Sequence, residues 1–326
     1  MRSIHVGLVG TGYAAKLRAE TFHADSRSHL VAVAGHTPER VQSFGETYSI
    51  GVEETWEELI RRSDIDLVVI ATVNRDHGTI VRAALEAKKH VVVEYPLSLD
   101  VSEAEALVQL ASTQQKLLHV EHIELLSGIH LAVRSALPQI GQPFHVRYSS
   151  LNPQRPAPQK WTYHPELFGF PLVGAVSRIH RLTDLFGSVA TVSCQSRVWG
   201  MEEASPFYRS CICTAQLRFT SGLIAEVNYG KGEAIWQPVR TLEIQGEQGA
   251  IVIDREQGTL IRAEQTVELD VGSRRGLFAK DTAAILDYLE NNTPLYVSPQ
   301  ASLQALRVAH AAQRSAETGQ TIALDP

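Results

Sequence analysis

The sequence predicts an α/β protein with two domains: an N-terminal domain built on a doubly wound parallel sheet, and a C-terminal α+β domain with a large, mostly antiparallel sheet. Short β-branched runs alternate with helical stretches from Ile4 to about His122, as in βαβ units. After Gly141 this pattern gives way to long runs of alternating apolar and polar residues. The length of 326 residues suits two domains of roughly 150 residues, and we place the boundary between residues 1–123 and 124–326.

The first domain has five predicted strands, at residues 4–9, 30–34, 66–72, 90–94 and 117–122. Two of the helices between them have clear starts. Thr37 is an N-cap followed by Pro38 at the first helical position, and Thr55 to Glu58 is a capping box. These local signals agree with a parallel sheet whose strands are connected by helices.

The second domain has predicted strands at residues 144–150, 189–199, 210–219, 223–230, 241–245 and 250–254. Glycine-containing turns at 220–222 and 247–249 join several of them as hairpins. Predicted helices at 172–186, 278–290 and 302–318 cover one face of this sheet and leave the other for solvent or a second subunit. We therefore expect a monomer, or a homodimer that associates through the C-terminal sheet.

The composition excludes several classes of partner. The 30 lysines and arginines against 36 aspartates and glutamates leave a net charge of −6, which argues against nucleic acid as a partner. The apolar runs are far shorter than the about 20 residues of a membrane-spanning helix. Cys194, Cys211 and Cys213 form no C-x-x-C pair, and Cys211 and Cys213 alternate as strand residues on one face, so we expect reduced thiols, a cytoplasmic protein and no metal site.

A glycine-rich turn follows the first predicted strand and predicts a dinucleotide site. The stretch Gly10-Thr11-Gly12-Tyr13-Ala14-Ala15 matches G-x-G-x-x-A between a strand and a helix, the context of the Rossmann fingerprint. Gly10 permits the tight turn, Gly12 lets the backbone approach the pyrophosphate, and Ala15 keeps helix and strand close. The alternative is a purely structural glycine-rich turn.

The end of the second strand favours NADPH, with NADH bound more weakly. No carboxylate lies there to hold a ribose 2′-hydroxyl, whereas His36, Thr37 and Arg40 supply donors for a 2′-phosphate, with Arg18 as a further helper. For Arg40 a solvated helix face is an equally good interpretation. The predicted cofactor set also contains Thr72, Asn74, His77 and Glu94.

The stretch Glu94-Tyr95-Pro96 resembles the strand-end Glu-Lys-Pro motif of the glucose-fructose oxidoreductase and inositol dehydrogenase (Gfo/Idh/MocA) family, with Tyr95 in place of the lysine. A second family motif, D-x-G-x-H-x-x-D, is altered as well. Anchored on Asp184, it places Ser177, Ile179 and Arg181 at the other three positions. The Glu-Tyr-Pro stretch is instead similar to the biliverdin reductases of this family, and so are the segments 118–126, 168–178 and 272–278. The last of these segments resembles the cyanobacterial branch of the biliverdin reductases.

This resemblance implies reduction of biliverdin to bilirubin by NADPH, with hydride transfer to the central methine bridge. Its implied catalytic residues are Arg178, Tyr95, Glu94 and His122, and its substrate-binding residues are Tyr95, Arg178, Arg181 and Phe170. From the residues themselves, Pro96 favours a cis bond that aims Tyr95, and a phenol of pKa about 10 suits positioning better than acid catalysis. A sugar or polyol dehydrogenase and a non-catalytic dinucleotide sensor are the alternatives.

Arg178 and Arg181 are three positions apart, so on a helix they project from nearly the same face and predict an anion site. A solvated helix face is the alternative, although the apolar neighbours suggest that at least one is sheltered beside an anionic partner. Biliverdin carries two propionates. We expect its ring system to lie on an open apolar sheet face with aromatics such as Tyr163, Phe168, Tyr229 or Trp236.

Four residues at the end of the predicted strand 117–122 and just after it suggest a metal site but alternate in direction. On a strand, His119 and Glu121 face one side while His122 and Glu124 face the other, so one metal ion cannot easily collect all four. We expect His119 to be structural. The roles of Glu121, His122 and Glu124 stay open, with a carboxylate or His122 beside the nicotinamide as one possibility.

Overall fold

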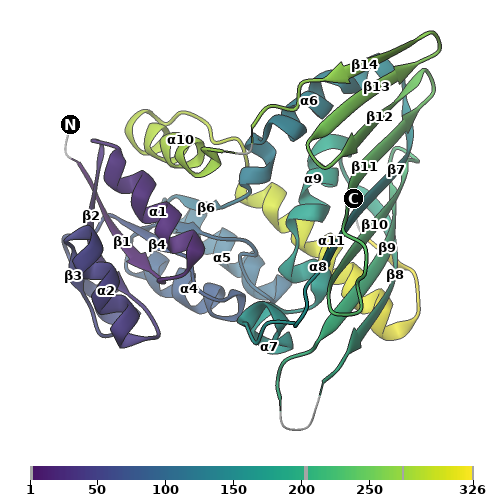
Figure 1. Cartoon of the computed structure of the whole chain (residues 1–326). Coiled ribbons are helices and arrows are strands. Elements are labelled where there is room, and N and C mark those ends of the chain that lie inside the picture. The colour runs from purple at the N-terminus through teal and green to yellow at the C-terminus, as the bar shows by residue number, and fades with distance from the viewer. Residues whose placement is uncertain (1–2, 202–204, 274, 325–326) are drawn as a thin grey trace. The chain divides into compact units, whose positions relative to one another are not determined.

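A computed structural model describes residues 3–201, 205–273 and 275–324; Arg274, in the segment 272–278, lies outside them. The chain divides into two compact units (Figure 1). Unit 1 contains residues 1–123 and 276–303, and unit 2 contains 124–275 and 304–326. The first division between the units falls after Ile123, and the segment 276–303 returns to unit 1, whereas the sequence pattern predicts a single domain over 124–326. No helix among the described residues is long and apolar enough to span a membrane.

The sheet of unit 1 is entirely parallel, and its strand order is β3-β2-β1-β4-β5-β6. This order confirms the doubly wound fold. The central strands read Leu-Val-Val-Ile and His-Val-Val-Val, and seven of these eight residues are buried because both faces of the sheet are covered. The strands are β1 (Ile4–Val9), β2 (Ser28–Ala34), β3 (Gly51–Val52), β4 (Leu67–Ile70), β5 (His90–Val93) and β6 (Leu118–Val120).

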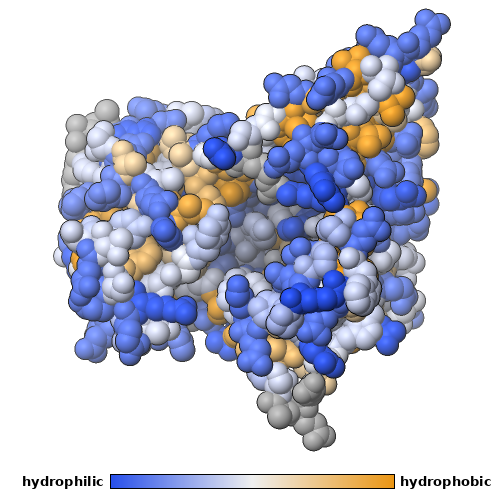
Figure 2. All heavy atoms as spheres, in the orientation of Figure 1, coloured by the Kyte–Doolittle hydropathy of each residue, from blue (hydrophilic) through white to orange (hydrophobic). Residues whose placement is uncertain are grey.

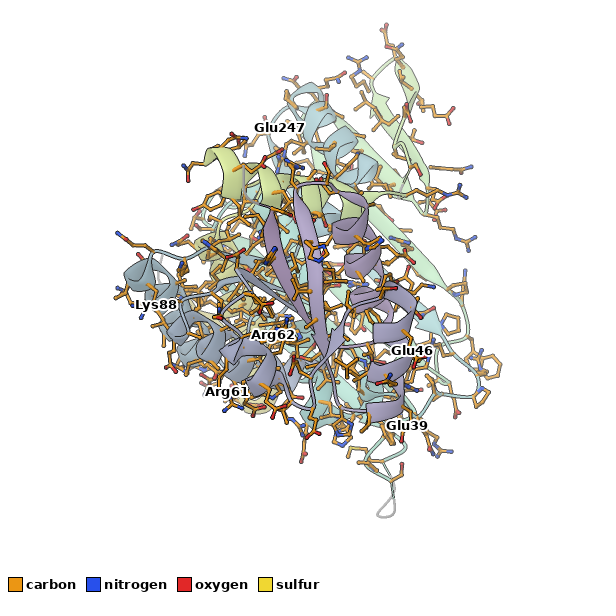
Figure 3. The ribbon with its side chains drawn as sticks, turned by 90° about the vertical axis from the view of Figure 1, so that its left-hand side faces the viewer. Glu39, Glu46, Arg61, Arg62, Lys88 and Glu247 are labelled. Atoms are coloured by element: carbon orange, nitrogen blue, oxygen red, sulfur yellow. The ribbon has the colours of Figure 1, made fainter. Side chains whose placement is uncertain are left out.

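The helices of unit 1 begin at the residues that the local signals indicate. Pro38 opens α2 after Thr37, and the Thr55 side chain caps α3 by accepting from the backbone N–H of Glu58 at 3.2 Å. Charged side chains such as Glu39 and Glu46 on α2 lie on the outer surface (Figure 3). The helices are α1 (Tyr13–Ala24), α2 (Pro38–Tyr48), α3 (Trp56–Arg61), α4 (His77–Glu86) and α5 (Val101–Gln114), with the short η1 (Asn74–Asp76) and η2 (Ile123–Leu126, mostly in unit 2).

The returning segment completes the core of unit 1. Helix α10 (Leu277–Asn291) lies beside α1 (Figure 1), and its Ile285 and Leu286 are fully buried in the same apolar cluster as Phe22 and Leu30. A helix more than 250 positions later in the chain thus packs against the first helix of the unit. The helix predicted at 278–290 is present, but the prediction that it covers the antiparallel sheet is wrong, because periodicity does not identify the surface on which a helix packs.

The sheet of unit 2 has the order β14-β13-β12-β11-β7-β10-β9-β8-β15 and is antiparallel except for the parallel pair β7 and β10. This confirms the predicted mostly antiparallel sheet. Its strands are β7 (Pro143–Pro153), β8 (Val189–Trp199), β9 (Ser210–Phe219), β10 (Ile224–Gly232), β11 (Val239–Gly246), β12 (Gly249–Asp254), β13 (Gln257–Arg262), β14 (Gln265–Leu269) and β15 (Ile322–Ala323). The last three were not predicted.

The two faces of this sheet differ. Along β9 the odd-numbered residues are largely buried and the even-numbered residues are mostly exposed, so Cys211 and Cys213 share the buried face as predicted. Helices α6 (Gly128–Ala136), α8 (Pro171–Gly174), α9 (Ser177–Phe186) and α11 (Pro299–Thr318) follow one face of the sheet (Figure 1). In the space-filling view, hydrophobic residues gather over the end of the sheet where β12–β14 lie (Figure 2).

The single helix predicted over 172–186 is wrong in detail, because the chain forms α8, a break at Ala175 and Val176, and then α9. At Gly174 an added Cβ would lie 2.5 Å from the backbone oxygen of Phe168. The close approach of the preceding α7 (Pro165–Phe168) therefore occupies the space that a regular continuing helix with side chains would need. The short η3 (Leu137–Ile140) and η4 (Trp161–Tyr163) complete the unit.

Candidate active site

The turn between β1 and α1 has the shape that a pyrophosphate requires. Gly10 adopts φ +122°, and a Cβ there would lie 2.3 Å from the backbone oxygen of Ala71. At Gly12, the N-cap of α1, an added Cβ would meet nothing within 4 Å, and no side chain caps the helix. Ala15 is fully buried against the sheet. The uncapped amides of the first turn and the open space at Gly12 fit a phosphate group.

The residues predicted to select the cofactor lie at the end of β2 and the start of α2. His36 and Arg40 are exposed and Thr37 is half-buried, so all three are accessible to a ligand. Glu39 is exposed in the same first turn of α2 (Figure 3). The structure does not place Arg18 with them, because its side chain is fully buried elsewhere in unit 1.

His77 connects the ends of two neighbouring strands. Its Nδ1 lies 2.7 Å from the backbone oxygen of Pro96, after β5, and its Nε2 lies 3.4 Å from that of Thr72, after β4. Burial lowers the pKa of His77, so its ring is neutral at pH 7 and carries one N–H, which suits the shorter contact. Asn74 is also buried, at the start of η1. Thr72, Asn74 and His77 therefore lie together at this edge of the sheet.

Glu94 is held at the end of β5 by a buried arginine. Arg18 Nε donates to Glu94 Oε1 at 2.8 Å, and Arg18 Nη1 donates to Asp281 Oδ2 of α10. Burial alone would raise the pKa of Asp281, but Arg18 and His119 outweigh it and hold the pKa below its usual value. This ion-pair cluster is the physical reason that Arg18 was misassigned: its partners come from β5 and α10, which the sequence does not bring together.

His119 and Glu121 lie on the side of the same cluster. His119 Nε2 and the Tyr296 hydroxyl each contact Asp281 Oδ1 at 2.7 Å, so His119 is structural as expected. Burial and the nearby Glu94 raise the pKa of Glu121 well above its usual value, and its Oε1 accepts from the backbone N–H of Ile123 at 2.5 Å. Glu121 therefore favours its protonated form more strongly than an exposed glutamate does.

Tyr95 stacks on His122. Their ring centroids are 5.6 Å apart with an interplanar angle of 5°, and the Tyr95-Pro96 bond is cis, as predicted. His122 Nε2 lies 2.8 Å from Ser302 Oγ. The four residues considered for a metal site thus have separate partners: His119 and Glu121 in the Arg18 cluster, His122 beside Tyr95, and Glu124 in unit 2.

The two arginines of α9 have different environments. Arg181 is 4% exposed, and its Nη2 donates to Glu124 Oε2 at 2.7 Å while its guanidinium lies over the Tyr148 ring. The prediction that one arginine is sheltered beside a carboxylate is confirmed, but that carboxylate belongs to the chain, and Arg181 does not lie open to a ligand as predicted. Arg178 is half-buried, with its guanidinium carbon 5.4 Å from the centroid of the Tyr229 ring. Phe170 is half-buried at the start of α8.

The aromatic residues expected on an open sheet face instead surround a buried lysine. The Lys231 Nζ lies 3.8 Å from the ring centroid of Phe168, 4.8 Å from that of Tyr163 and 5.9 Å from that of Tyr229, and donates to the backbone oxygen of Thr162. Burial lowers the pKa of Lys231 to about 8, and the charge of Arg178 adds to this effect. Trp236, by contrast, is 81% exposed. Sequence reasoning missed Lys231, although its position two residues after Tyr229 places it on the same face of β10.

Arg178 lines a groove of about 840 Å³ that lies entirely within unit 2. Its walls are formed by β7, the start of α9, β11 and the turn between β12 and β13, and they include Glu124, Tyr148, Ser150, Leu151, Asn152, Ser177, Pro238, Val239, Arg240, Asp254, Arg255, Glu256 and Gln257. This volume lies in the range of small-molecule and cofactor sites.

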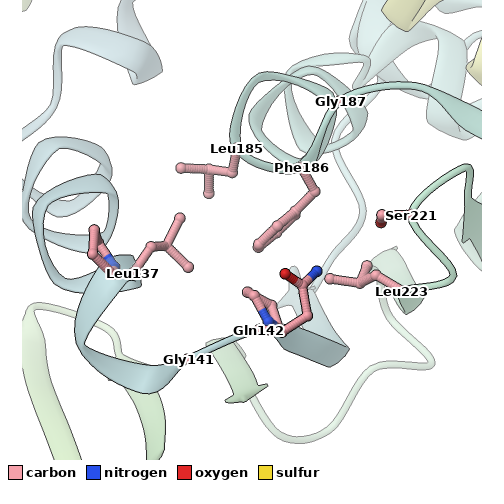
Figure 4. Close-up of a pocket in the computed structure, with 10 residues that line it drawn as sticks. Leu137, Gly141, Gln142, Leu185, Phe186, Gly187, Ser221 and Leu223 are labelled. Atoms are coloured by element: carbon pink, nitrogen blue, oxygen red, sulfur yellow. The ribbon is translucent and has the colours of Figure 1, made fainter. Parts of the chain in front are cut away.

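A smaller hollow of about 390 Å³, lined by Leu137, Leu185, Phe186 and Leu223 among others, has no ionisable side chain in its lining (Figure 4). The groove is therefore the better candidate for an anionic substrate.

Comparisons with known proteins agree with this architecture. Residues 4–122 match the family model described as "Oxidoreductase family, NAD-binding Rossmann fold", and residues 136–324 match "Oxidoreductase family, C-terminal alpha/beta domain", both of the Gfo/Idh/MocA group. The chain is 29% identical to biliverdin reductase A of Mus musculus over 59% of its own length and 61% of the relative's, less than two thirds of that protein. It is 23% identical to myo-inositol 2-dehydrogenase of Thermotoga maritima over 99% of both chains.

A solved structure is similar over nearly the whole chain. It is biliverdin reductase from Synechocystis sp. PCC 6803 in complex with biliverdin and NADP+, with 49% sequence identity and a TM-score of 0.94. The match covers 96% of this chain and 99% of the other. Both the cofactor domain and the second unit are included in this similarity.

Proposed function

Because the chain belongs to the Gfo/Idh/MocA family of oxidoreductases, we propose that it uses NADPH to reduce biliverdin to bilirubin. The observation that carries this proposal is the 49% identity, over nearly the whole chain, to an enzyme whose structure holds biliverdin and NADP+. Two substitutions in the family motifs support it. Tyr95 replaces the lysine that serves sugar oxidation, and Arg181, which pairs with Glu124, replaces the motif histidine.

When bound, NADPH would supply a hydride for the central methine carbon of biliverdin; together with a proton at a pyrrole nitrogen, the substrate would gain two electrons and two hydrogens. The chain binds the pyrophosphate at Gly10 to Ala15 and the 2′-phosphate at His36, Thr37 and Arg40. Glu94, fixed by Arg18, orients the nicotinamide end together with Thr72, Asn74 and His77. In this proposal these residues position the cofactor.

Arg178 has the role of stabilising negative charge on the bilin during reduction. A guanidinium does not deprotonate at neutral pH, so Arg178 acts as an electrostatic donor and directs a water molecule that delivers the proton. Tyr95, stacked on His122, positions the ring system instead of donating the proton. Phe170 contributes an apolar contact to the substrate.

The direct test mixes the purified protein with NADPH and biliverdin and follows bilirubin absorbance. We expect bilirubin formation that depends on both compounds and is slower with NADH. Gly12→Ala is a matched control: an added Cβ meets no protein atom within 4 Å, so the variant should fold, yet the methyl group crowds the pyrophosphate and should abolish activity.

Two outcomes would overturn the proposal in different ways. NADPH binding without bilirubin formation would indicate a dinucleotide sensor. Reduction of NADP+ by myo-inositol or another polyol, without activity on biliverdin, would indicate a sugar or polyol dehydrogenase, the activity named for the Thermotoga relative.

A further inference from the structure

The groove of unit 2 contains two arginines that the preceding argument does not use. Arg240 on β11 and Arg255 in the turn after β12 line it together with Arg178. Both side chains are exposed, and among the described residues neither forms an ion pair. Arg181, which was predicted to hold a substrate carboxylate, is occupied by Glu124. The available positive charge therefore lies at positions 240 and 255.

The sheet register places Arg240 on the groove side. Arg240 pairs with Ser150 of β7, and Ser150 pairs on its other side with Tyr229 of β10. Paired residues in neighbouring strands point to the same face, so Arg240, Ser150 and Tyr229 form one row across the sheet. Tyr229 is the residue whose ring lies beside Arg178. The row thus connects Arg240 to the proposed catalytic arginine.

Arg255 is held next to Arg240 by the backbone. Its N–H donates to the backbone oxygen of Arg240 at 2.8 Å, and its φ of +54° belongs to a tight turn. The side chains of Arg240 and Arg255 are therefore attached to backbone positions that are hydrogen-bonded to each other. Since a guanidinium presents a planar fork of donors, each can take one carboxylate in a bidentate manner.

The acidic residues of the groove do not neutralise these arginines. Glu124 pairs with Arg181, and Asp254 and Glu256 in the turn form no ion pair within 4 Å with Arg240 or Arg255 among the described residues. The negative charges of Asp254 and Glu256 instead disfavour a ligand whose own negative charge is spread over its whole surface. The arrangement suits a mostly apolar, extended molecule with a few carboxylates that reach the arginines.

We propose that Arg240 and Arg255 form a carboxylate-binding subsite that holds the propionates of a linear tetrapyrrole in this groove. The inference rests on the proposed function, since it assigns the site for the charged ends of the same substrate. Arg240 and Arg255 are binding residues that set affinity and the preference for a free diacid. Arg178 acts on the reacting part of the molecule.

The test compares biliverdin with its dimethyl ester, which keeps the ring system and removes both negative charges. For Arg240→Ala and Arg255→Ala we expect the KM for biliverdin to rise about tenfold each, because a charge-assisted hydrogen bond contributes about this factor, with kcat nearly unchanged. The KM for the dimethyl ester should stay the same in both variants. Arg218→Ala, an exposed arginine on the even-numbered face of β9, is the matched control and should behave as the wild type with both compounds.

Equal effects of the variants on diacid and diester, or an equal effect of Arg218→Ala, would overturn the subsite. A wild-type protein that forms no bilirubin would instead contradict the proposed function. In that case equilibrium binding of diacid and diester, followed by the absorbance of the bilin, tests the subsite by itself. The wild type should then prefer the diacid, and the double variant Arg240→Ala/Arg255→Ala should bind both forms equally; equal binding by the wild type would refute the subsite as well.

Discussion

Arg18 in unit 1 and the groove arginines Arg240 and Arg255 in unit 2 have opposite environments. In unit 1, Arg18 is fully buried between Glu94 and Asp281, and its charge is balanced within the chain. In the groove of unit 2, Arg240 and Arg255 are exposed and form no ion pair among the residues that the structure describes. Helix α9 contains both behaviours three residues apart, with Arg181 paired to Glu124 and Arg178 at the groove. Whether an arginine serves folding or a ligand thus depends on a carboxylate that arrives from a distant part of the chain.

The largest expected effect is on the buried cluster. Arg18→Met leaves Asp281 and Glu94 without their cation, and breaking a buried ion pair in this way costs about 3–5 kcal/mol in the free energy of unfolding. Urea denaturation measures the loss, and Asp281→Asn should lose stability as well if Arg18→Met does not fold. Arg62→Met, whose partners Glu53 and Asp64 are partly exposed, is the control and should lose less than about 1 kcal/mol. Similar losses of unfolding free energy for Arg18→Met and Arg62→Met would show that the buried cluster contributes no more than a partly exposed ion pair.

The contrast within α9 is tested next. Arg178→Ala should lower kcat about 10²- to 10³-fold, with a smaller effect on KM, because one preorganised donor to the reacting group is lost. Its melting temperature should stay near that of the wild type. Arg181→Ala should instead lower the melting temperature, since the Glu124 carboxylate loses its partner. An exchange of these two phenotypes would contradict the assignment.

Lys231 should make stability depend on pH. Its pKa falls from the usual 10.5 to about 8 in the folded chain, chiefly through burial. Between these values the unfolded chain binds a proton that the folded chain does not, so stability rises with pH. Relative to Lys231→Met, the wild type should gain about 2 kcal/mol of unfolding free energy between pH 7.5 and 9.5. If the unfolding free energies of the wild type and Lys231→Met changed with pH in parallel, folding would not lower the pKa of Lys231.

Cofactor choice should respond to a single surface arginine. Arg40→Ala should raise the KM for NADPH about tenfold and leave the KM for NADH nearly unchanged, because only NADPH carries the 2′-phosphate. Steady-state kinetics with each cofactor measures the difference. Equal effects on both would place Arg40 on a solvated helix face, the alternative interpretation of that residue.

The smallest effect is expected at Tyr95. Tyr95→Phe keeps the ring that stacks on His122 and removes only the hydroxyl, so turnover should fall by less than about tenfold. A general acid typically contributes about 10²- to 10⁴-fold. A loss in that range with unchanged substrate binding would identify Tyr95 as the proton donor.

Local and periodic features of the sequence determined much of this protein. The alternation of strands and helices predicts the parallel sheet, and the alternation of apolar and polar residues predicts the antiparallel sheet. The Gly10 to Ala15 turn predicts the phosphate cradle, because a tight turn and a close helix each require particular residues at fixed spacing. The helix start at Thr55 and the shared face of Cys211 and Cys213 follow from the same local rules. These features need no knowledge of what packs against them.

Only the tertiary structure decided which charged groups are neutralised. The two carboxylate partners of Arg18 lie 76 and 263 positions away in the sequence. The partner of Arg181 lies 57 positions away. No sequence periodicity carries information over such separations. The return of α10 to unit 1 and the aromatic surroundings of Lys231 are decided in the same way. A cationic side chain is costly to bury without a partner, so the role of each arginine or lysine depends on whether folding brings a carboxylate, an aromatic ring or open space beside it.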